Sequence, residues 1–395
     1  MCRIMTVYGT RPEAIKVAPV IKAVEQEPGL TSLTVVTGQH REMLDQVNEL
    51  FGIVPDRDLD VIRHGQGLSQ LAARILERFD ATLDEMRPSA VLVQGDTTTS
   101  TAAALAAFHR QIPVFHLEAG LRSGDVYSPF PEEMNRRLTS RLSALHLAPT
   151  DESRANLLRE GVDVDEVVVT GNTVIDALMA TVRAELEIQD PQVRSAVDAA
   201  TRTLLVTAHR RESWGKALQG VGRALRQIAR LHPDLTIVLP LHRNPLVRAA
   251  ILPSVEGLRN VVICEPLSYA DFAVLLSRSA VVLTDSGGIQ EEAPSLGKPV
   301  LVMRDNTERP EAVDAGTVRL IGTAEERIVR EVDRLLTDPD AYRAMARAVN
   351  PYGDGKASGR VVASVRHFFG MGSRPVDFRA QPYREPAGAM VGSAS

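Results

Sequence analysis

The sequence is poor in cysteine and has no long apolar run. Cys2 and Cys264 are the only cysteines among 395 residues, which excludes a disulfide scaffold and a thiolate zinc cluster and fits a reducing compartment. No apolar run approaches the roughly 20 residues that a membrane span needs. The N-terminus leads into a strand-like pattern instead of a signal peptide. We therefore expect a cytoplasmic protein with no membrane partner.

Positive charge is not in excess. The net charge is −5, so the overall field of the protein does not favour nucleic acid as a partner. An anionic small ligand would have to be bound by local cations. The candidates for this role are Arg11, Lys16, Arg136, Arg210, Arg211 and Arg309.

Two further signals are missing. No G-x-G-x-x-G string follows a predicted strand, because Gly220-Val-Gly222 lies inside a helical pattern and lacks the third glycine. No cluster of His, Asp and Glu has the spacing of metal ligands. We therefore expect neither a nicotinamide cofactor nor a metal.

The length and pattern of the chain predict an α/β protein with two domains. Short apolar runs alternate with amphipathic stretches of helical length, which indicates βαβ units and parallel sheets. Six strands are predicted in the first half, at 4–8, 33–37, 91–94, 114–117, 145–148 and 167–170. Six more are predicted at 204–207, 236–239, 261–263, 281–284, 300–303 and 317–321.

The domain boundary is expected near a charged segment in the middle of the chain. Residues 177–202 have a helical pattern with a proline at Pro191, so the boundary should lie there or just before it. We predict Rossmann-like domains over 1–175 and 176–350, facing one cleft. From about Gly370 the chain consists of Gly, Ser, Pro, Arg and Ala without periodicity, so residues 371–395 are expected to be disordered.

The most informative segment runs from residue 284 to residue 298. An apolar strand at 281–283 leads into Ser286–Gly288 and then into a helix that is rich in carboxylates. Two adjacent glycines let backbone N–H groups approach phosphate oxygens, and the helix points its positive end at the anion. Glu291 and Glu292, one turn later, are placed to accept ribose hydroxyls. The short string alone would also fit an ordinary strand-to-helix turn.

Polar residues also follow other predicted strands. Asp96, Glu118, His209 and Ser286 each come directly after a strand, and Arg11 follows the first strand. Ligands of open parallel sheets bind outside the carboxyl ends of the strands, so these positions predict one active site built by both halves. Asp96 alone could be a helix N-cap. Glu118, between an apolar strand and Ala-Gly, is a poorer cap and a better candidate for catalysis.

Several ordered segments resemble the non-hydrolysing UDP-N-acetylglucosamine 2-epimerases. The resemblance covers roughly residues 1 to 370. The matching segments are 284–298, Gly9-Thr-Arg-Pro-Glu-Ala-Ile-Lys16, Thr37-Gly-Gln-His40, Val93-Gln-Gly-Asp-Thr97, His116-Leu-Glu-Ala-Gly-Leu-Arg122, Pro131-Glu-Glu-Met-Asn-Arg136, Gly171-Asn-Thr-Val-Ile-Asp176, Thr207-Ala-His-Arg-Arg-Glu212 and Arg304-Asp-Asn-Thr-Glu-Arg-Pro-Glu311.

The resemblance implies a fold and a reaction. It implies the two-domain glycosyltransferase-B fold, with a C-terminal helix over 351–370 packing back on the first domain. It also implies reversible conversion of UDP-GlcNAc to UDP-ManNAc through a bound 2-acetamidoglucal and UDP, without a cofactor, to supply cell-surface polysaccharide synthesis. The chemistry agrees, because inversion beside the anomeric centre needs either oxidation or elimination, and oxidation would need a nicotinamide site. Carboxylates suit the proton transfers of an elimination.

The resemblance also implies roles for individual residues. It implies catalytic roles for Asp96, Glu118, Glu132, His209 and Lys16. It implies substrate binding by Arg11, Lys16, Arg136, His209, Phe272, Ser286, Gly287, Gly288, Glu292 and Arg309. Arginine suits paired phosphate contacts and glutamate suits ribose. Phe272 would lie near the uracil, with a buried helix residue as the alternative. Which carboxylate deprotonates C2 stays open.

The resemblance leaves regulation and alternatives open. Gln39, His40 and His242 match part of a second UDP-GlcNAc site that activates bacterial relatives, while Glu42 and Gly65 depart from that site. Relatives are commonly homodimers. A hydrolysing 2-epimerase that releases ManNAc and UDP, a glycosyltransferase of the same fold and a non-enzymatic nucleotide-sugar sensor are the alternative functions.

Overall fold

A computed structural model describes residues 1–38, 41–63, 65–210, 215–307 and 309–380. The chain forms two compact units. The first comprises Met1–Arg183 and Tyr352–Phe378, and the second is built from Ala184–Pro351. Each unit contains one parallel sheet with helices between successive strands, which confirms the predicted α/β class.

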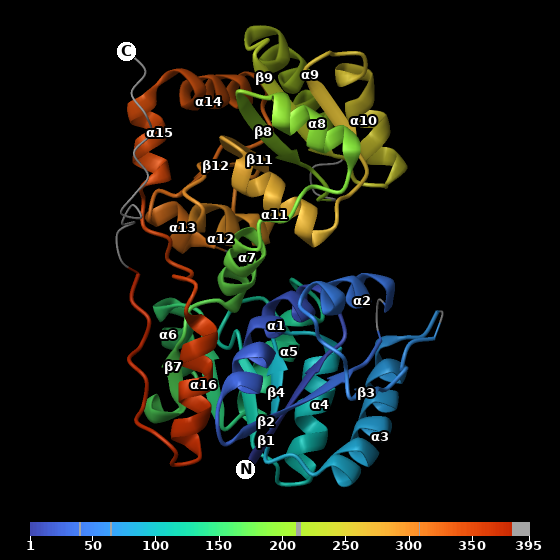
Figure 1. The fold of residues 1–395 in the computed structure, drawn as a ribbon, viewed down its shortest axis with the longest axis vertical. Coiled ribbons are helices and arrows are strands. Elements are labelled where there is room, and N and C mark those ends of the chain that lie inside the picture. Colours follow the sequence, from blue (N-terminus) through green and yellow to red (C-terminus); the bar gives the residue numbers. More distant parts are fainter. Residues whose placement is uncertain (39–40, 64, 211–214, 308, 381–395) are drawn as a thin grey trace. The chain divides into compact units, whose positions relative to one another are not determined.

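The first unit contains a seven-stranded sheet in the order β3-β2-β1-β4-β5-β6-β7 (Figure 1). Its strands are β1 Cys2–Tyr8, β2 Leu30–Val36, β3 Arg57–Asp58, β4 Ala90–Gln94, β5 Val114–Leu117, β6 Leu145–Ala148 and β7 Val167–Val169. Its helices are α1 Arg11–Gln26, α2 Arg41–Leu50, α3 Leu68–Met86, α4 Thr98–His109, α5 Glu132–Leu142, α6 Asp151–Arg159, α7 Thr173–Arg183 and α16 Ala357–Phe368. Strands such as β4 are buried at every position because helices cover both faces of the sheet.

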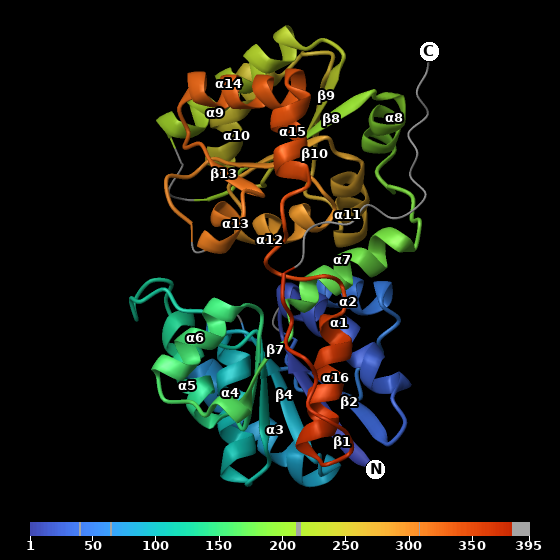
Figure 2. The same cartoon turned by 90° about the vertical axis from the view of Figure 1, so that its left-hand side faces the viewer.

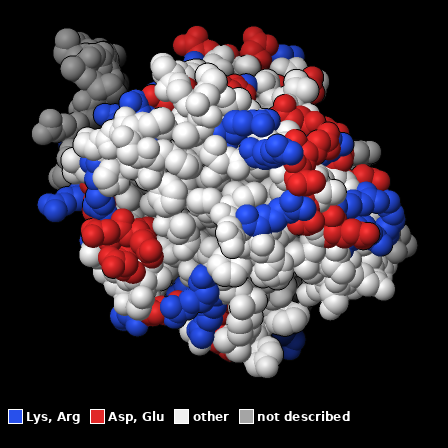
Figure 3. Space-filling view, turned by 90° about the horizontal axis from the view of Figure 1, so that it is seen from below, with Lys and Arg blue, Asp and Glu red and all other residues white. Residues whose placement is uncertain are grey.

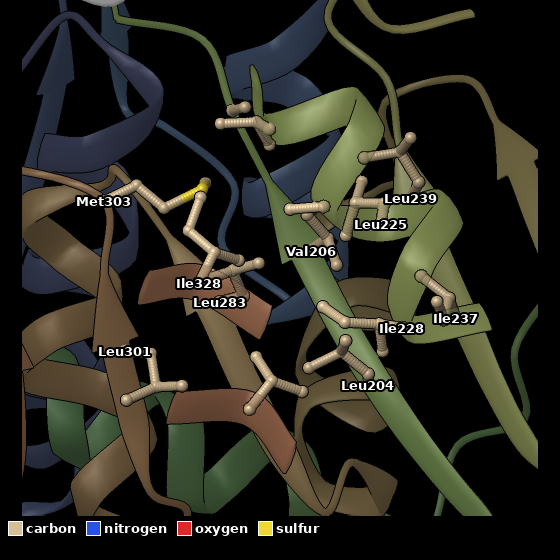
Figure 4. Packing of buried hydrophobic residues seen from close by; sticks show 14 of the residues in the cluster. Leu204, Val206, Leu225, Ile228, Ile237, Leu239, Leu283, Leu301, Met303 and Ile328 are labelled. Carbon is tan, nitrogen blue, oxygen red and sulfur yellow. The ribbon is translucent and has the colours of Figure 1, made fainter. Parts of the chain in front are cut away.

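The second unit contains a six-stranded sheet in the order β10-β9-β8-β11-β12-β13. Its strands are β8 Arg202–Thr207, β9 Leu235–Pro240, β10 Val261–Cys264, β11 Val281–Thr284, β12 Val300–Val302 and β13 Val318–Leu320. Its helices are α8 Pro191–Ala199, α9 Lys216–Leu231, α10 Pro245–Val255, α11 Tyr269–Arg278, α12 Gly287–Ser295, α13 Pro310–Asp314, α14 Glu325–Thr337 and α15 Pro339–Ala346. Figure 4 shows the apolar side chains of β8, β9 and β11 meeting those of α9 and α14 in the core of this unit.

All twelve predicted strands are present, and one strand was missed. Strand β3 has only two residues, Arg57 and Asp58, and neither is apolar, so it leaves no pattern in the sequence. The predicted helical segment 177–202 is two helices instead of one. Helix α7 ends at Arg183, and Pro191 begins α8, because proline is favoured at the first helical position and not in a helix interior.

Residues 374–378, which belong to the segment 371–395 expected to be disordered, are bound by hydrogen bonds to the first unit, whereas residues 381–395 lie outside the described part of the chain. Helix α16 lies alongside α1 in the first unit (Figure 2), and residues 374–378 then run beside β7. The N–H of Phe378 donates to the carbonyl of Val169 at 2.7 Å, and Asp377 accepts the N–H of Val169 at 2.9 Å. Composition could not reveal this segment, because it is ordered by the unpaired edge of a strand that lies about 200 residues earlier in the chain.

Charged side chains form small groups of mixed sign. On the face seen in Figure 3, acidic and basic residues lie next to each other. Arg110 of the first unit, for example, pairs with both Asp80 and Asp84. A search of the described residues found no helix that is long and apolar enough to cross a membrane.

Two buried histidines make the first unit sensitive to acid. His116 in β5 and His146 in β6 are paired neighbours in the sheet. Burial lowers the pKa of His116 to about 4 and that of His146 to about 3, from an ordinary value of 6.5. Both histidines are therefore neutral in the folded protein at pH 5, whereas the unfolded chain binds a proton at each.

We predict that acidification destabilises the protein through these two histidines. The stability that each neutral histidine contributes is complete above pH 6.5 and is lost as the pH falls toward its pKa in the folded protein. Each histidine should therefore lower the free energy of unfolding by about 2 kcal/mol between pH 7 and pH 5. Urea unfolding at several pH values measures the slope. His146→Gln should reduce the slope, while His109→Gln, at an exposed position, should leave it unchanged. Equal slopes in wild type and His146→Gln would contradict the assignment.

Candidate active site

In the first unit, the predicted residues gather at the point where the strand order reverses. Strands β1 and β4 are neighbours there; Arg11 begins the helix that follows β1, and Asp96 lies in the loop after β4. Glu118 follows β5, the next strand in the sheet. In doubly wound sheets, the diverging loops at this switch point leave a crevice for a ligand.

Glu118 is a buried carboxylate surrounded by hydrogen-bond donors. It is 8% exposed. The Lys16 ammonium lies 2.5 Å from Oε1 and 2.7 Å from Oε2, Asn172 donates to Oε1 at 3.1 Å, and Gln94 donates to Oε2. Several donors and a cation compensate for the burial of the charge and stabilise the ionised form.

The backbone at Glu118 is unusual. Its φ is +62°, in the left-handed region that residues with a Cβ rarely adopt. Such residues persist where the surroundings hold them, and they cluster at functional sites. Gly120 follows with φ +92°, and a Cβ there would lie 2.1 Å from the Ser153 carbonyl oxygen, so this loop needs glycine. The fold therefore holds Glu118 in one orientation.

Asp96 pairs with Arg136 from α5. The distance from Arg136 Nη2 to Asp96 Oδ2 is 2.6 Å, and the Asn135 side chain donates to the Asp96 carbonyl at 2.9 Å. Glu132, the first residue of α5, has a buried Oε2 for which the described part of the chain offers no hydrogen-bond partner. The structure thus brings Asp96 and Arg136 together and leaves one oxygen of Glu132 available to a ligand.

A second buried carboxylate ties together the loops after β1 and β4. Glu13 accepts the N–H groups of Gly9 at 3.0 Å and Thr10 at 2.8 Å, and the Thr97 hydroxyl at 2.7 Å. Burial raises the pKa of Glu13, and these hydrogen bonds oppose the shift. Because Arg11 directly follows the first of these loops and Asp96 lies in the second, Glu13 sets the positions of both backbones.

In the second unit, the switch point lies between β8 and β11. His209 follows β8, and Asp285 and Ser286 follow β11. Asp285 Oδ2 accepts the N–H groups of His209 at 2.7 Å and Arg210 at 2.9 Å, and Asp285 Oδ1 lies 2.8 Å from Nδ1 of His209. Burial favours the neutral acid, but the contacts with His209 and the two N–H groups outweigh it and lower the pKa of Asp285.

The first turn of α12 meets two guanidinium groups. A Cβ on Gly287 would lie 2.7 Å from Nη1 of Arg309 and 3.5 Å from Nη2 of Arg210, so both cations lie against the surface that the missing side chain exposes. The helix N-terminus adds its free N–H groups and its positive partial charge. The arrangement suits a phosphate or diphosphate.

The two adjacent glutamates of α12 differ in their surroundings. Oε1 of Glu292 would lie 3.3 Å from a Cβ on Gly288, so Glu292 is beside the glycine pair, and its contact with ribose stays a prediction. Glu291 is buried and forms an ion pair with Arg309, and its expected ribose contact stays a prediction. A buried carboxylate needs a cation, and Arg309 supplies one.

Of the remaining predicted residues, one lies on α11, one lies beside His209, and two lie outside the described part of the chain. Phe272 is half-buried on α11 and follows the N-cap Ser268 by one turn. His242 is exposed and its ring stacks on that of His209, with ring centroids 6.3 Å apart. Gln39 and His40 lie outside the described residues. Among the residues that are described, no group of three or more His, Cys, Asp or Glu side chains is arranged to hold a metal.

Sequence reasoning assigned no role to three residues of these clusters. Gln94 and Asn172 donate to Glu118, and Asp285 holds His209. Each occurs within a segment that supported the resemblance, or directly next to one of its predicted residues. Their roles depend on which strands are neighbours, and a single sequence does not contain that information.

Comparisons with known proteins identify the family of the chain. The family model described as UDP-N-acetylglucosamine 2-epimerase matches residues 22–366. An Escherichia coli O157:H7 UDP-N-acetylglucosamine 2-epimerase is 52% identical over 374 residues, which are 92% of this chain and 98% of that protein. A Salmonella typhimurium protein of the same name is 51% identical over 375 residues, 93% of this chain and 99% of the relative.

A solved structure extends the similarity to three dimensions. The crystal structure of UDP-GlcNAc 2-epimerase from Neisseria meningitidis, bound to UDP-GlcNAc, is 47% identical and superposes with a TM-score of 0.82. The match covers 92% of this chain and all of that one. The predicted resemblance is thereby confirmed along nearly the whole chain. The chain belongs to the UDP-N-acetylglucosamine 2-epimerase family.

Proposed function

We propose that the protein catalyses the reversible epimerisation of UDP-GlcNAc to UDP-ManNAc at C2, by elimination and re-addition of UDP and without a redox cofactor. The observation that most directly supports this proposal is the buried Glu118 at a switch point of the sheet. Its backbone is left-handed, and its carboxylate contacts Lys16, Gln94 and Asn172. Family membership supports the same reaction. A bound UDP-GlcNAc in the Neisseria meningitidis relative supports the substrate.

The proposed reaction balances without an oxidant. A carboxylate takes the proton from C2, the C–H electrons form the C1–C2 double bond of 2-acetamidoglucal, and the C1–O bond breaks with its electrons going to UDP. In the reverse direction, UDP adds at C1 while a carboxylic acid returns a proton to the opposite face of C2. Both fragments must stay bound between the two steps.

The first unit supplies the proton-transfer groups of this proposal. Asp96, Glu118 and Glu132 are its acids and bases, and Glu118 has the surroundings of a group that is ionised at rest. Lys16 and Arg136 hold two of these carboxylates and carry positive charge to the sugar end of the substrate. General acid–base catalysis of this kind contributes typically 10²–10⁴-fold in rate.

The second unit supplies the nucleotide-binding groups. Ser286, Gly287 and Gly288 at the start of α12, together with Arg309, would hold the diphosphate. The family resemblance implies that Arg11 also binds the nucleotide. His209 would present Nε2 to the departing phosphate, because Nδ1 faces Asp285. Glu292 would accept the ribose hydroxyls and Phe272 would lie near the uracil. These groups stabilise the charge that develops on UDP as it leaves.

Proton NMR of the purified protein with UDP-GlcNAc in D2O tests the proposal, with no cofactor or metal added. We expect UDP-ManNAc to appear with deuterium at C2, since the abstracted proton exchanges with solvent. Free ManNAc with UDP would instead identify the hydrolysing reaction. A lack of any reaction, also with UDP-ManNAc as substrate, would contradict the proposal and favour the transferase or sensor alternatives.

The proposal includes a homodimer in a cytoplasmic setting, as the family resemblance implies and as two free cysteines suit. Sedimentation equilibrium should give about twice the chain mass of 43.0 kDa. A concentration-independent monomer that still epimerises UDP-GlcNAc would contradict the dimer alone. The supply of surface polysaccharide precursors is the pathway that this reaction would serve.

We predict that Gly287→Ala weakens UDP binding without unfolding the protein. The new methyl group would lie 2.7 Å from the end of the flexible Arg309 side chain, so the guanidinium moves and the backbone does not. The loss of one charge-assisted phosphate contact costs roughly 1.5–3 kcal/mol, or about ten- to a hundredfold in Kd. Calorimetric titration with UDP measures the change.

Gly359→Ala in α16 is the matched control, because nothing lies within 4 Å of a Cβ there. It should leave the Kd for UDP unchanged. An unchanged Kd in Gly287→Ala as well would show that α12 does not hold the phosphates.

A further inference from the structure

The segment 374–378, here called the strap, replaces the missing neighbour of the edge strand β7. It runs beside β7 at the far end of the chain (Figure 1). Phe378 N–H donates to the Val169 carbonyl, Asp377 accepts the Val169 N–H, and Arg374 donates to the Val167 carbonyl. Arg154 of α6 fixes Asp377 from the other side at 3.2 Å. The strap is therefore bound through both backbone and side chains.

Phe378 at the end of the strap packs on the turn that follows β7. It is 4% exposed, and its ring carbon Cγ would lie 3.6 Å from a Cβ on Gly171, which has φ +83°. The guanidinium of Arg360 lies over the same ring at 5.2 Å and donates to the Thr170 carbonyl at 3.2 Å. The Phe378 ring and the Arg360 guanidinium thus both contact the Thr170–Gly171 segment.

The next residue of this turn reaches the proposed catalytic carboxylate. Asn172 donates from Nδ2 to Oε1 of Glu118 at 3.1 Å, and its own N–H donates to the Tyr352 carbonyl at 2.7 Å. Its Oδ1 accepts the N–H of Val174, so the amide has one orientation. A shift of the turn would move this donor relative to Glu118.

We propose that Phe378 is a positioning residue for Glu118, acting through the Gly171–Asn172 turn. The inference rests on the proposed epimerase function and adds to it a role for a segment beyond α16. The Phe378 side chain has no polar group that could take part in proton transfer; its ring packs on the turn whose Asn172 amide donates to Glu118. If Glu118 moves, its carboxylate is no longer aligned for proton transfer with the substrate. Small misplacements of a catalytic group reduce the rate by up to about a hundredfold.

Steady-state kinetics of Phe378→Ala in the full chain tests the role. We expect kcat to fall about tenfold with KM for UDP-GlcNAc changed by less than about twofold, since the nucleotide-binding groups are untouched. Phe378→Leu should restore most of the activity by refilling the space. Val376→Ala, at an 84% exposed position of the same strap, is the matched control and should behave as wild type.

A double-mutant cycle separates positioning from general stability. Asn172→Ala alone should lower kcat, and Phe378→Ala should add little to it, because both act on one contact. If the two substitutions reduce kcat independently, so that their effects multiply in the double mutant, the positioning role would be overturned. It would also be overturned if Phe378→Ala lowers the Tm but leaves kcat at the wild-type value well below that Tm.

Hydrogen exchange provides a readout that does not depend on activity. Amides of residues 169–174 should exchange faster in Phe378→Ala than in wild type or Val376→Ala. An unchanged exchange rate of these amides in Phe378→Ala would show that the strap does not fix the turn. If wild type itself does not epimerise, the proposed function fails, while this exchange measurement still decides whether the strap fixes the turn.

Discussion

The cost of burying a carboxylate governs much of this structure. Glu118 lies at the carboxyl end of a central strand, where water cannot reach most of its surface. An isolated charge there would be strongly unfavourable, so the fold must supply a cation and hydrogen-bond donors. Lys16 comes from α1, Gln94 from β4 and Asn172 from the turn after β7. One acidic side chain therefore constrains three segments from different parts of the chain.

Each unit uses a buried carboxylate to join the two loops of its switch point. Glu13 in the first unit accepts N–H groups from the loop after β1 and a hydroxyl from the loop after β4. Asp285 in the second unit, from the loop after β11, accepts N–H groups from the loop after β8. In both cases, the joined loops carry the residues proposed to act on the substrate. Rigid loops at the strand ends reduce the reorganisation that a bound substrate would require.

The predicted strands were confirmed because a parallel sheet buried on both faces produces continuous apolar runs, which are easy to recognise. The errors arose where structure depends on distant partners. Strand β3 is two polar residues that are ordered by β2, and the strap is ordered by the edge of β7. The ion pair of Glu291 with Arg309 was likewise not visible in the sequence. None of these pairings leaves a local pattern.

The sequence by itself determined the fold class, every described strand except β3, the family and the residue types at the strand ends. These follow from local composition and from ordered motifs, and they do not require knowledge of which strands are neighbours. Only the tertiary structure decided that Gln94 and Asn172 serve Glu118, that Asp285 orients His209, and that Phe378 packs on the Gly171 turn. These contacts join residues far apart in the chain, and they exist because the order of strands in each sheet brings separate loops together.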